Sequence, residues 1–212
     1  MTLQNRVDPF GKIHAVAERG TLFGNRGGCF HDSQQHLRGR HWVNKRWITC
    51  LLAYTGWHRE VMTPNRYTEL FFLDEATAFP AGHRPCMLCR RADANRFIDA
   101  WARAHLPPGQ RVRTVDHVDD IAHRERLDAR HRRQRTTRVH LATLPDGALV
   151  TRDDAPEQPL LLWQGRLHQW SFGGYTGTFP RPTDEAVTLL TPPSFAFAFA
   201  AGYTPAVHDS AR

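Results

Sequence analysis

Short apolar runs separated by turn-forming residues dominate the first third of the chain. A continuous apolar run over residues 47–54 is typical of a buried strand, and a short return at residues 61–62 predicts a hairpin. A further strand is expected over residues 67–73. Asp74 then occupies the N-cap position of a short helix over residues 75–81, which the glycine that follows would end.

Two longer helices are expected in the middle of the chain. Pro85 suits the first turn of a helix that continues until a Pro-Pro pair, and the second helix is expected over residues 115–130. Further on, two apolar runs flank Gln164 and Gly165, which predicts a hairpin. Residues 193–201 alternate phenylalanine with alanine and suit a short helix or a strand equally well.

These patterns predict an α+β fold, with short strands and hairpins around two central helices and a β-rich C-terminal part. The expected division is an N-terminal α+β domain over residues 1–140 and a hairpin-rich part over residues 141–212, packed on the first as one unit. A hydrophobic content of 41% in 212 residues is enough to bury a core.

Basic residues are concentrated in one segment. The formal net charge is +7, and residues 124–138 hold seven arginines against two acidic residues. Because guanidinium groups suit phosphates, this segment predicts a nucleic-acid contact, and the alternative is a solvated surface. The candidate nucleic-acid-binding residues are Arg124, Arg126, Arg130, Arg132, Arg133 and Arg135.

The sequence gives no signal for export or membrane insertion. No apolar stretch approaches the roughly 20 residues that a bilayer needs, and the N-terminal segment has no apolar core. The four cysteines are not spaced like a secreted disulfide framework. A cytoplasmic location, no membrane partner, and thiols that are free or bind metal are therefore expected.

Cys86 and Cys89 form the most specific chemical signal. A Cys-x-x-Cys pair in the first turn of a helix places both thiols on one face, at the end where the helix dipole favours thiolates. Such a pair suits metal binding or redox chemistry, and metal binding is preferred because thioredoxin-type redox motifs follow a strand of a βαβ unit. The alternative is that both cysteines are small buried apolar side chains.

The same region resembles a known zinc module. The residues that carry the resemblance are Phe71-Phe72, Glu75-Ala76, Ala78, Ala81-Gly82, Arg84-Pro85-Cys86 and Cys89-Arg90. Over about residues 48–91 the chain is similar to the zinc-binding module of Ada-type DNA repair proteins, which implies a strand, a short helix, zinc on four cysteines and DNA binding. The first cysteine pair of that family would fall near Thr55 and Arg59, so methyl transfer, which needs that pair, is not implied. The resemblance then implies zinc on Cys86 and Cys89, with the remaining ligands drawn from Cys50, His58 or His83. The whole chain also resembles a bacterial protein family, a resemblance that implies no activity.

Two enzyme classes are alternatives. The spacing of His58 and Glu60 relative to the Cys-x-x-Cys pair matches the zinc deaminase signature, in which the histidine and both cysteines bind zinc and Glu60 would transfer protons. Asp116 and His117 suggest a metal-dependent nuclease of the HNH kind, although a second Cys-x-x-Cys pair is missing.

A third constellation arises if residues 115–130 are helical. Asp116, Asp120 and His123 then share one face, where a carboxylate could orient an imidazole that acts as a general base. The commoner explanation is a set of surface ion pairs, such as Asp120 with Arg124. The candidate catalytic residues are Asp120, His123 and Glu60.

These signals favour a zinc-supported nucleic-acid-binding protein that binds or processes DNA ahead of RNA, in a repair-like role. The alternatives are a zinc-dependent nucleobase deaminase that uses Glu60, an HNH-like nuclease, and a non-catalytic interaction protein whose cysteines only brace the fold.

Overall fold

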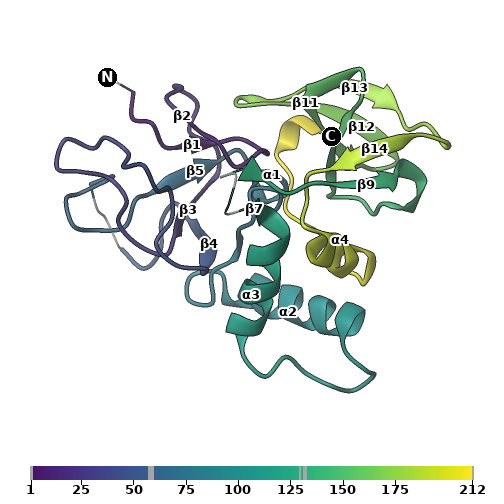
Figure 1. Cartoon of the computed structure of the whole chain (residues 1–212), viewed down its shortest axis with the longest axis horizontal. Coiled ribbons are helices and arrows are strands. Elements are labelled where there is room, and N and C mark those ends of the chain that lie inside the picture. The colour runs from purple at the N-terminus through teal and green to yellow at the C-terminus, as the bar shows by residue number, and fades with distance from the viewer. Residues whose placement is uncertain (1, 57–59, 129, 131–132, 212) are drawn as a thin grey trace.

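The computed structural model describes residues 2–56, 60–128, 130 and 133–211. Within these residues the chain is α+β, with two six-stranded sheets, a two-stranded sheet and four α-helices, and the C-terminal part is rich in strands, as the sequence predicts. Figure 1 shows the two larger sheets on opposite sides of the molecule, with the longer helices grouped beside them. No helix among the described residues is long and apolar enough to cross a bilayer.

The N-terminal sheet is built from short strands. In spatial order it contains β2 (Ile13–His14), β1 (Arg6–Val7), β5 (Leu70–Phe72), β3 (Leu22–Arg26), β4 (Trp47–Leu51) and β6 (Arg84–Pro85). Strand β4 pairs antiparallel with β3 and parallel with β6. The predicted hairpin between residues 47–54 and 61–62 is wrong, because β3 supplies the antiparallel partner of β4 along all five of its residues.

Alternation along β3 and β4 divides their side chains between two faces of the sheet. Phe23, Ile48 and Cys50 line a cavity on one face. Trp47 and Arg26 line a second cavity on the other face. The same short strands therefore position two separate groups of chemically reactive or charged side chains.

Helices α2, α3 and α4 pack against one another around an aromatic core. The helices are α1 (Glu75–Ala78), α2 (Arg91–His105), α3 (Val115–Arg126) and α4 (Pro193–Ala200). Asp74 caps α1 by accepting a hydrogen bond from the backbone N–H of Thr77, as the sequence predicts. The core of this group contains Phe79, Phe97 and Trp101, all almost completely buried.

Both predicted central helices form, but with different ends. The first begins at Arg91 and not at Pro85, because Pro85 lies in β6, where it is opposite Thr49 of β4. The second ends at Arg126, and the chain continues as the two-stranded sheet of β7 (Leu127–Asp128) and β8 (Arg133–Gln134). The arginine-rich segment therefore begins in the last turn of α3, with Arg124 and Arg126, and its described remainder continues through β7, β8 and β9 and not as a helix.

The C-terminal sheet is antiparallel throughout. In spatial order it contains β13 (Gly174–Pro180), β12 (Arg166–Ser171), β11 (Ala155–Trp163), β10 (Leu149–Arg152), β14 (Ala186–Leu189) and β9 (Thr137–His140). The predicted hairpin at Gln164 and Gly165 is present, and both residues have positive φ. Two short 3₁₀-helices, Leu141–Thr143 and Asp209–Ala211, complete this part.

Two acidic residues at the start of α1 connect the N-terminal and C-terminal parts. The Asp74 carboxylate accepts hydrogen bonds from the Tyr175 hydroxyl at 2.9 Å and from the backbone N–H of His208 at 2.9 Å. The Glu75 carboxylate accepts hydrogen bonds from the Tyr203 hydroxyl at 2.8 Å and from Arg90 at 2.7 Å. These acceptors are buried, so both parts contribute to one polar network.

Candidate metal centre

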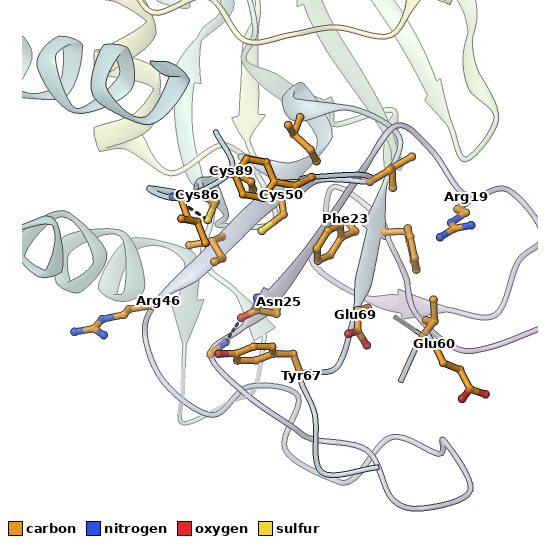
Figure 2. A pocket seen from close by; sticks show the side chains of 18 of the residues that line it. Arg19, Phe23, Asn25, Arg46, Cys50, Glu60, Tyr67, Glu69, Cys86 and Cys89 are labelled. Atoms are coloured by element: carbon orange, nitrogen blue, oxygen red, sulfur yellow. Dashed lines mark hydrogen bonds between the residues drawn. The ribbon is translucent and has the colours of Figure 1, made fainter. Parts of the chain in front are cut away.

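Three thiols converge at the edge of the N-terminal sheet. Cys50 comes from β4, and Cys86 and Cys89 come from the turn between β6 and α2. Their sulfur atoms all lie within 4.8 Å of one another. Figure 2 shows the three side chains grouped together at one end of a cavity. Among the described residues, this is the single group of three or more metal-ligating side chains that converges in this way.

The parallel pairing of β4 and β6 explains why the thiols meet. Ile48 is opposite Arg84 and Thr49 is opposite Pro85, so the next residues along the two strands are Cys50 and Cys86. The backbone N–H of Cys86 donates to the Thr49 carbonyl at 2.9 Å, which continues the pairing up to the thiol. A turn then brings Cys89 back toward the same point, and the Arg90 N–H donates to the Cys86 carbonyl at 3.2 Å.

Hydrogen bonds within the turn stabilise a thiolate. The backbone N–H of Leu88 points at the Cys86 sulfur at 3.4 Å. Hydrogen bonds from the Cys50 and Cys89 thiols lower the pKa of Cys86 to about 2. The hydrogen bond that Cys50 makes to Cys86 raises the pKa of Cys50. These hydrogen bonds favour the thiolate form of Cys86, which is the form that binds a metal ion.

The spacing of the sulfur atoms suits zinc. A tetrahedral zinc with Zn–S bonds of about 2.3 Å holds its sulfur ligands about 3.8 Å apart. Three sulfur atoms that already lie within 4.8 Å need only a small contraction to reach this geometry. Thiolates are soft ligands, which favour zinc over magnesium or calcium. The three cysteines could therefore hold one metal ion and leave a fourth position for another ligand.

A cavity of about 830 Å³ opens beside the thiols. Ile48 and Phe71 are among the residues that line it. Figure 2 shows three further lining residues, Phe23, Asn25 and Glu69, with Arg46 at the rim. These positions alternate along β3, along β4, and from Glu69 into β5, as one face of a sheet requires. The volume is in the range of small-molecule sites, so the fourth metal position could face a ligand.

The structure selects among the candidates for a further ligand. Cys50 joins the pair, whereas His83 lies elsewhere, between the rings of Trp47 and Phe72 at centroid distances of 5.3 and 4.6 Å. Burial and the nearby guanidinium of Arg26 lower the pKa of His83 well below its usual value, so its ring stays neutral. His58 lies outside the described residues.

Glu60 lies far from the sulfur atoms. It lines the same cavity, but Figure 2 shows its side chain at the opposite end, with Phe23 and Glu69 between it and the cysteines. A proton donor or acceptor must come within hydrogen-bond reach of the reacting atom. The arrangement therefore gives no support to Glu60 as the proton-transferring residue of a deaminase.

The acidic residues of α3 are held in ion pairs. Asp116 pairs with Arg46 at 2.9 Å, and Asp120 pairs with Lys45 at 2.7 Å. The ion-pair explanation is the better one for this face, although the partners come from the loop before β4 and not from Arg124. The rings of His123 and Trp42 pack in a T-shaped arrangement instead, at a centroid distance of 4.8 Å. This face gives no support to a general-base pair of Asp120 and His123.

The environment of His117 does not resemble a nuclease metal site. Its ring packs edge-on against Trp101 at a centroid distance of 5.8 Å. Its neighbour Asp116 is already bound to Arg46. Among the described residues no metal-binding group forms around these two side chains.

The arginines of the basic segment fall into two groups. Arg124, Arg130, Arg133 and Arg135 are exposed on or beside the β7–β8 hairpin. Arg126 is only 4% exposed, and its guanidinium donates to the carbonyls of Gly82 and Lys45 at 2.6 and 2.7 Å. Arg132 lies outside the described residues. The basic surface is thus smaller than the sequence predicts, and Arg126 has a different environment from its neighbours.

Two features of the cavities were missed at the sequence level. Asn25 and Glu69 line the cavity beside the thiols, and Arg26 lines the opposite face of the same sheet. The alternating pattern of β3 would have placed Asn25 and Arg26 on opposite faces, but no pattern indicated that β3 pairs with β4.

Comparisons with protein-family models, with curated proteins and with solved structures find no match to this chain. Its function is therefore inferred from the geometry of the thiol cluster and from the placement of charge.

Proposed function

We propose that this chain is a zinc protein that binds nucleic acid, with DNA ahead of RNA. The convergence of Cys50, Cys86 and Cys89 within 4.8 Å is the observation that carries the proposal. Three thiolates and one further ligand make the usual tetrahedral zinc site. When bound, zinc would join β4 to the turn before α2 and so fix two segments that are far apart in the sequence.

The nucleic-acid part is supported by the position of the basic residues. The net charge of +7 includes the exposed group of Arg124, Arg130 and Arg135, at the end of α3 and on the β7–β8 hairpin. Guanidinium groups that neutralise phosphates release counterions, and this supplies most of the sequence-independent affinity for DNA. The resemblance to the Ada-type module is the reason for preferring DNA.

The metal site and the basic segment are connected through β4. Cys50 faces the thiol cluster, and Trp47 on the same strand faces the opposite side, where its ring stacks on the Arg126 guanidinium at 3.8 Å. Arg126 is the last residue of α3, directly before the basic hairpin. Loss of zinc is therefore expected to loosen β4 and the base of the hairpin together.

The test is DNA binding as a function of salt, with zinc-loaded protein. Reversing the charge at Arg124, Arg130 and Arg135 should weaken binding at least tenfold. It should also reduce the slope of log K against the logarithm of the salt concentration by about 0.9 for each phosphate that is no longer neutralised. The matched control reverses three exposed arginines on other surfaces, at Arg111, Arg113 and Arg166. An equal loss of affinity in both variants, or binding that does not depend on salt, would rule out a specific basic surface. Strands of RNA and DNA with the same sequence test the preference for DNA.

A zinc-dependent hydrolase is the second candidate, because the thiol cluster lies in the wall of a cavity. Zinc with an open fourth position supplies Lewis-acid chemistry. The buried carboxylate of Glu69 lines that cavity and accepts a hydrogen bond from the backbone N–H of Met62 at 2.8 Å. If Glu60→Gln and Glu69→Gln both retain zinc and leave any hydrolytic activity unchanged, neither carboxylate transfers the proton.

A further inference from the structure

A second cavity, of about 630 Å³, lies on the opposite face of the N-terminal sheet. It shares no lining residue with the cavity beside the thiols. Five basic side chains line it, and no aspartate or glutamate is among its described lining residues. The basic residues are Lys12, Arg26, Arg40, Arg126 and Arg133.

The buried arginines of this chain provide an internal comparison. Arg84 is 5% exposed, and Asp119 binds it through both carboxylate oxygens at 2.8 and 2.7 Å. Arg90 is 6% exposed and pairs with Glu75 at 2.7 Å. Both follow the general rule that a buried charge has a partner of opposite sign.

Arg26 and Arg126 depart from this rule. Each is 4% exposed, and within the described part of the chain neither has a carboxylate at ion-pair distance. Arg26 donates to the Gly11 carbonyl at 2.9 Å, and Arg126 has carbonyl partners, but its buried Nε has no partner there. Burial lowers the pKa of Arg26 to about 9 and lowers that of Arg126 as well.

Trp47 holds the two guanidinium groups in place. The Arg26 guanidinium carbon lies 4.4 Å from the Trp47 ring centroid, and that of Arg126 lies 3.8 Å from it. Such contacts fix the position of each cation but do not neutralise its charge. The carboxylate of Asp8 attracts Arg26, but it pairs with His14. The carboxylate of Asp119 attracts Arg126, but it pairs with Arg84. Among the described residues, no carboxylate is therefore bound directly to either guanidinium at the wall of the cavity.

An aromatic surface lies beside these cations. The Trp42 ring, which is only half-buried, also lines the cavity, with the Arg40 guanidinium 3.6 Å from its centroid. A half-buried aromatic ring next to arginine is an arrangement on which nucleobases stack. The cavity is too large for a phosphate alone and has the volume of a small-molecule site.

We propose that this cavity binds a nucleotide, with its phosphate near Arg26, Arg40 and Lys12 and its base against Trp42. The anion supplies a directly bound partner of opposite charge for the buried arginines. The nucleotide is either a free mononucleotide or the 5′-phosphorylated end of a strand. This inference goes beyond the proposed function, because neither the three cysteines nor Arg124, Arg130 and Arg135 line this cavity.

Calorimetry with adenosine 5′-monophosphate, adenosine and inorganic phosphate tests the site. The monophosphate should bind at least tenfold more tightly than adenosine, because only the phosphate meets the cations. It should also bind at least tenfold more tightly than inorganic phosphate, because only the nucleotide contacts Trp42. Equal affinity for the monophosphate and adenosine would overturn the phosphate site, and equal affinity for the monophosphate and inorganic phosphate would overturn the nucleotide assignment.

Variants at the rim avoid disturbing the buried arginines. Lys12→Ala with Arg40→Ala should weaken binding of the monophosphate at least tenfold, whereas Arg166→Ala, at an exposed hairpin position, should not change it. Unchanged binding in the Lys12 and Arg40 variant would overturn the proposal. A strand with a 5′-phosphate that binds more tightly than the same strand with a 5′-hydroxyl assigns the ligand to strand ends, and equal binding of the two strands assigns it to the free nucleotide.

Charge reversal at Arg124, Arg130 and Arg135 separates this proposal from the previous one. Those residues do not line the cavity, so the variant should lose DNA affinity and keep its affinity for the monophosphate. Loss of both affinities would overturn the assignment of a separate site.

Discussion

At the residue scale, the neutral rings of His83 and His123 lie close to the buried arginines. His83 lies against Trp47, and His123 contacts Trp42 and accepts a hydrogen bond at Nδ1 from the Arg126 guanidinium at 3.1 Å. Burial and the guanidinium of Arg126 lower the pKa of His123 to about 4. A protonated ring here would add a cation to a region that already has an excess of them.

The His123 ring is predicted to titrate near pH 4, as followed by proton NMR and assigned with His123→Asn. Between pH 4 and about 6.5 the unfolded chain binds a proton that the folded chain does not. The stability that the neutral ring contributes is therefore complete above pH 6.5 and is lost as the pH falls toward 4. A titration midpoint near 6.5 would show that the ring is not held among these cations.

The pair of Cys86 and Cys89 shows which metal ligands could be predicted from the sequence alone. Its spacing indicates a metal site without any knowledge of the fold. The third ligand could not be chosen among Cys50, His58 and His83, because that choice depends on which strands are neighbours. The register of β4 against β6 brings Cys50 to Cys86, and the sequence does not encode this register locally.

At the scale of elements, Gly82 is the position on which several segments converge. It has a φ of +83° and lies in the turn after α1, which ends at Ala78 and so is shorter than the helix predicted over residues 75–81. A Cβ at this position would lie 2.1 Å from Cδ of Arg126. The carbonyl of Gly82 also accepts the hydrogen bond from Arg126, so the turn, α3 and the basic cavity depend on the same backbone.

Gly82→Ala is predicted to be more destabilising than Gly165→Ala. Gly165 also has a positive φ, of +72°, but a Cβ there would meet no atom within 4 Å. Backbone strain alone should lower the free energy of unfolding by about 1–2 kcal/mol at Gly165. At Gly82 the clash with Arg126 adds to that strain, so a loss above about 2 kcal/mol is expected in urea denaturation. Equal losses at the two positions would show that Arg126 is not fixed against the turn.

Local rules placed the ends of the central helices incorrectly, and the reason is pairing between distant segments. Pro85 has the residue type favoured in the first turn of a helix, but a parallel pairing with β4 holds it in β6. Arginines after residue 126 suit a helix by propensity, whereas residues 127–128 pair with residues 133–134. In contrast, Asp74 and the Gln164-Gly165 turn act within a few residues, and both were predicted correctly.

At the scale of the whole molecule, α1 links the two larger sheets. Asp74 and Glu75 accept hydrogen bonds from residues that follow position 174, including Tyr175 and Tyr203. The strand pattern predicted an α+β fold with a β-rich C-terminal part, but not this connection. Strand β9, which precedes residue 141, pairs with β14 of the C-terminal sheet. The apolar pattern does not specify which strands pair when they are far apart in the sequence.

Tyr175→Phe is predicted to shift a single unfolding transition and not to split it. The hydroxyl donates to buried Asp74, and its loss should lower the free energy of unfolding by about 1–3 kcal/mol. Because the network joins both sheets, calorimetry should show one cooperative transition for the wild type and the variant. Two separate transitions in the wild type would show that the parts unfold independently.

The content of zinc per chain tests the central claim most directly, because the proposed function depends on three cysteines that bind one ion. Native mass spectrometry of the wild type should show one zinc, and Cys50→Ser and Cys86→Ser should each lose it. Cys29→Ser is the matched control, since the Cys29 sulfur lies 3.7 Å from Nδ1 of His31 and is not part of the cluster. A wild type without zinc after purification in its presence, or a Cys50→Ser variant that retains a full zinc equivalent, would contradict a zinc site built from these cysteines.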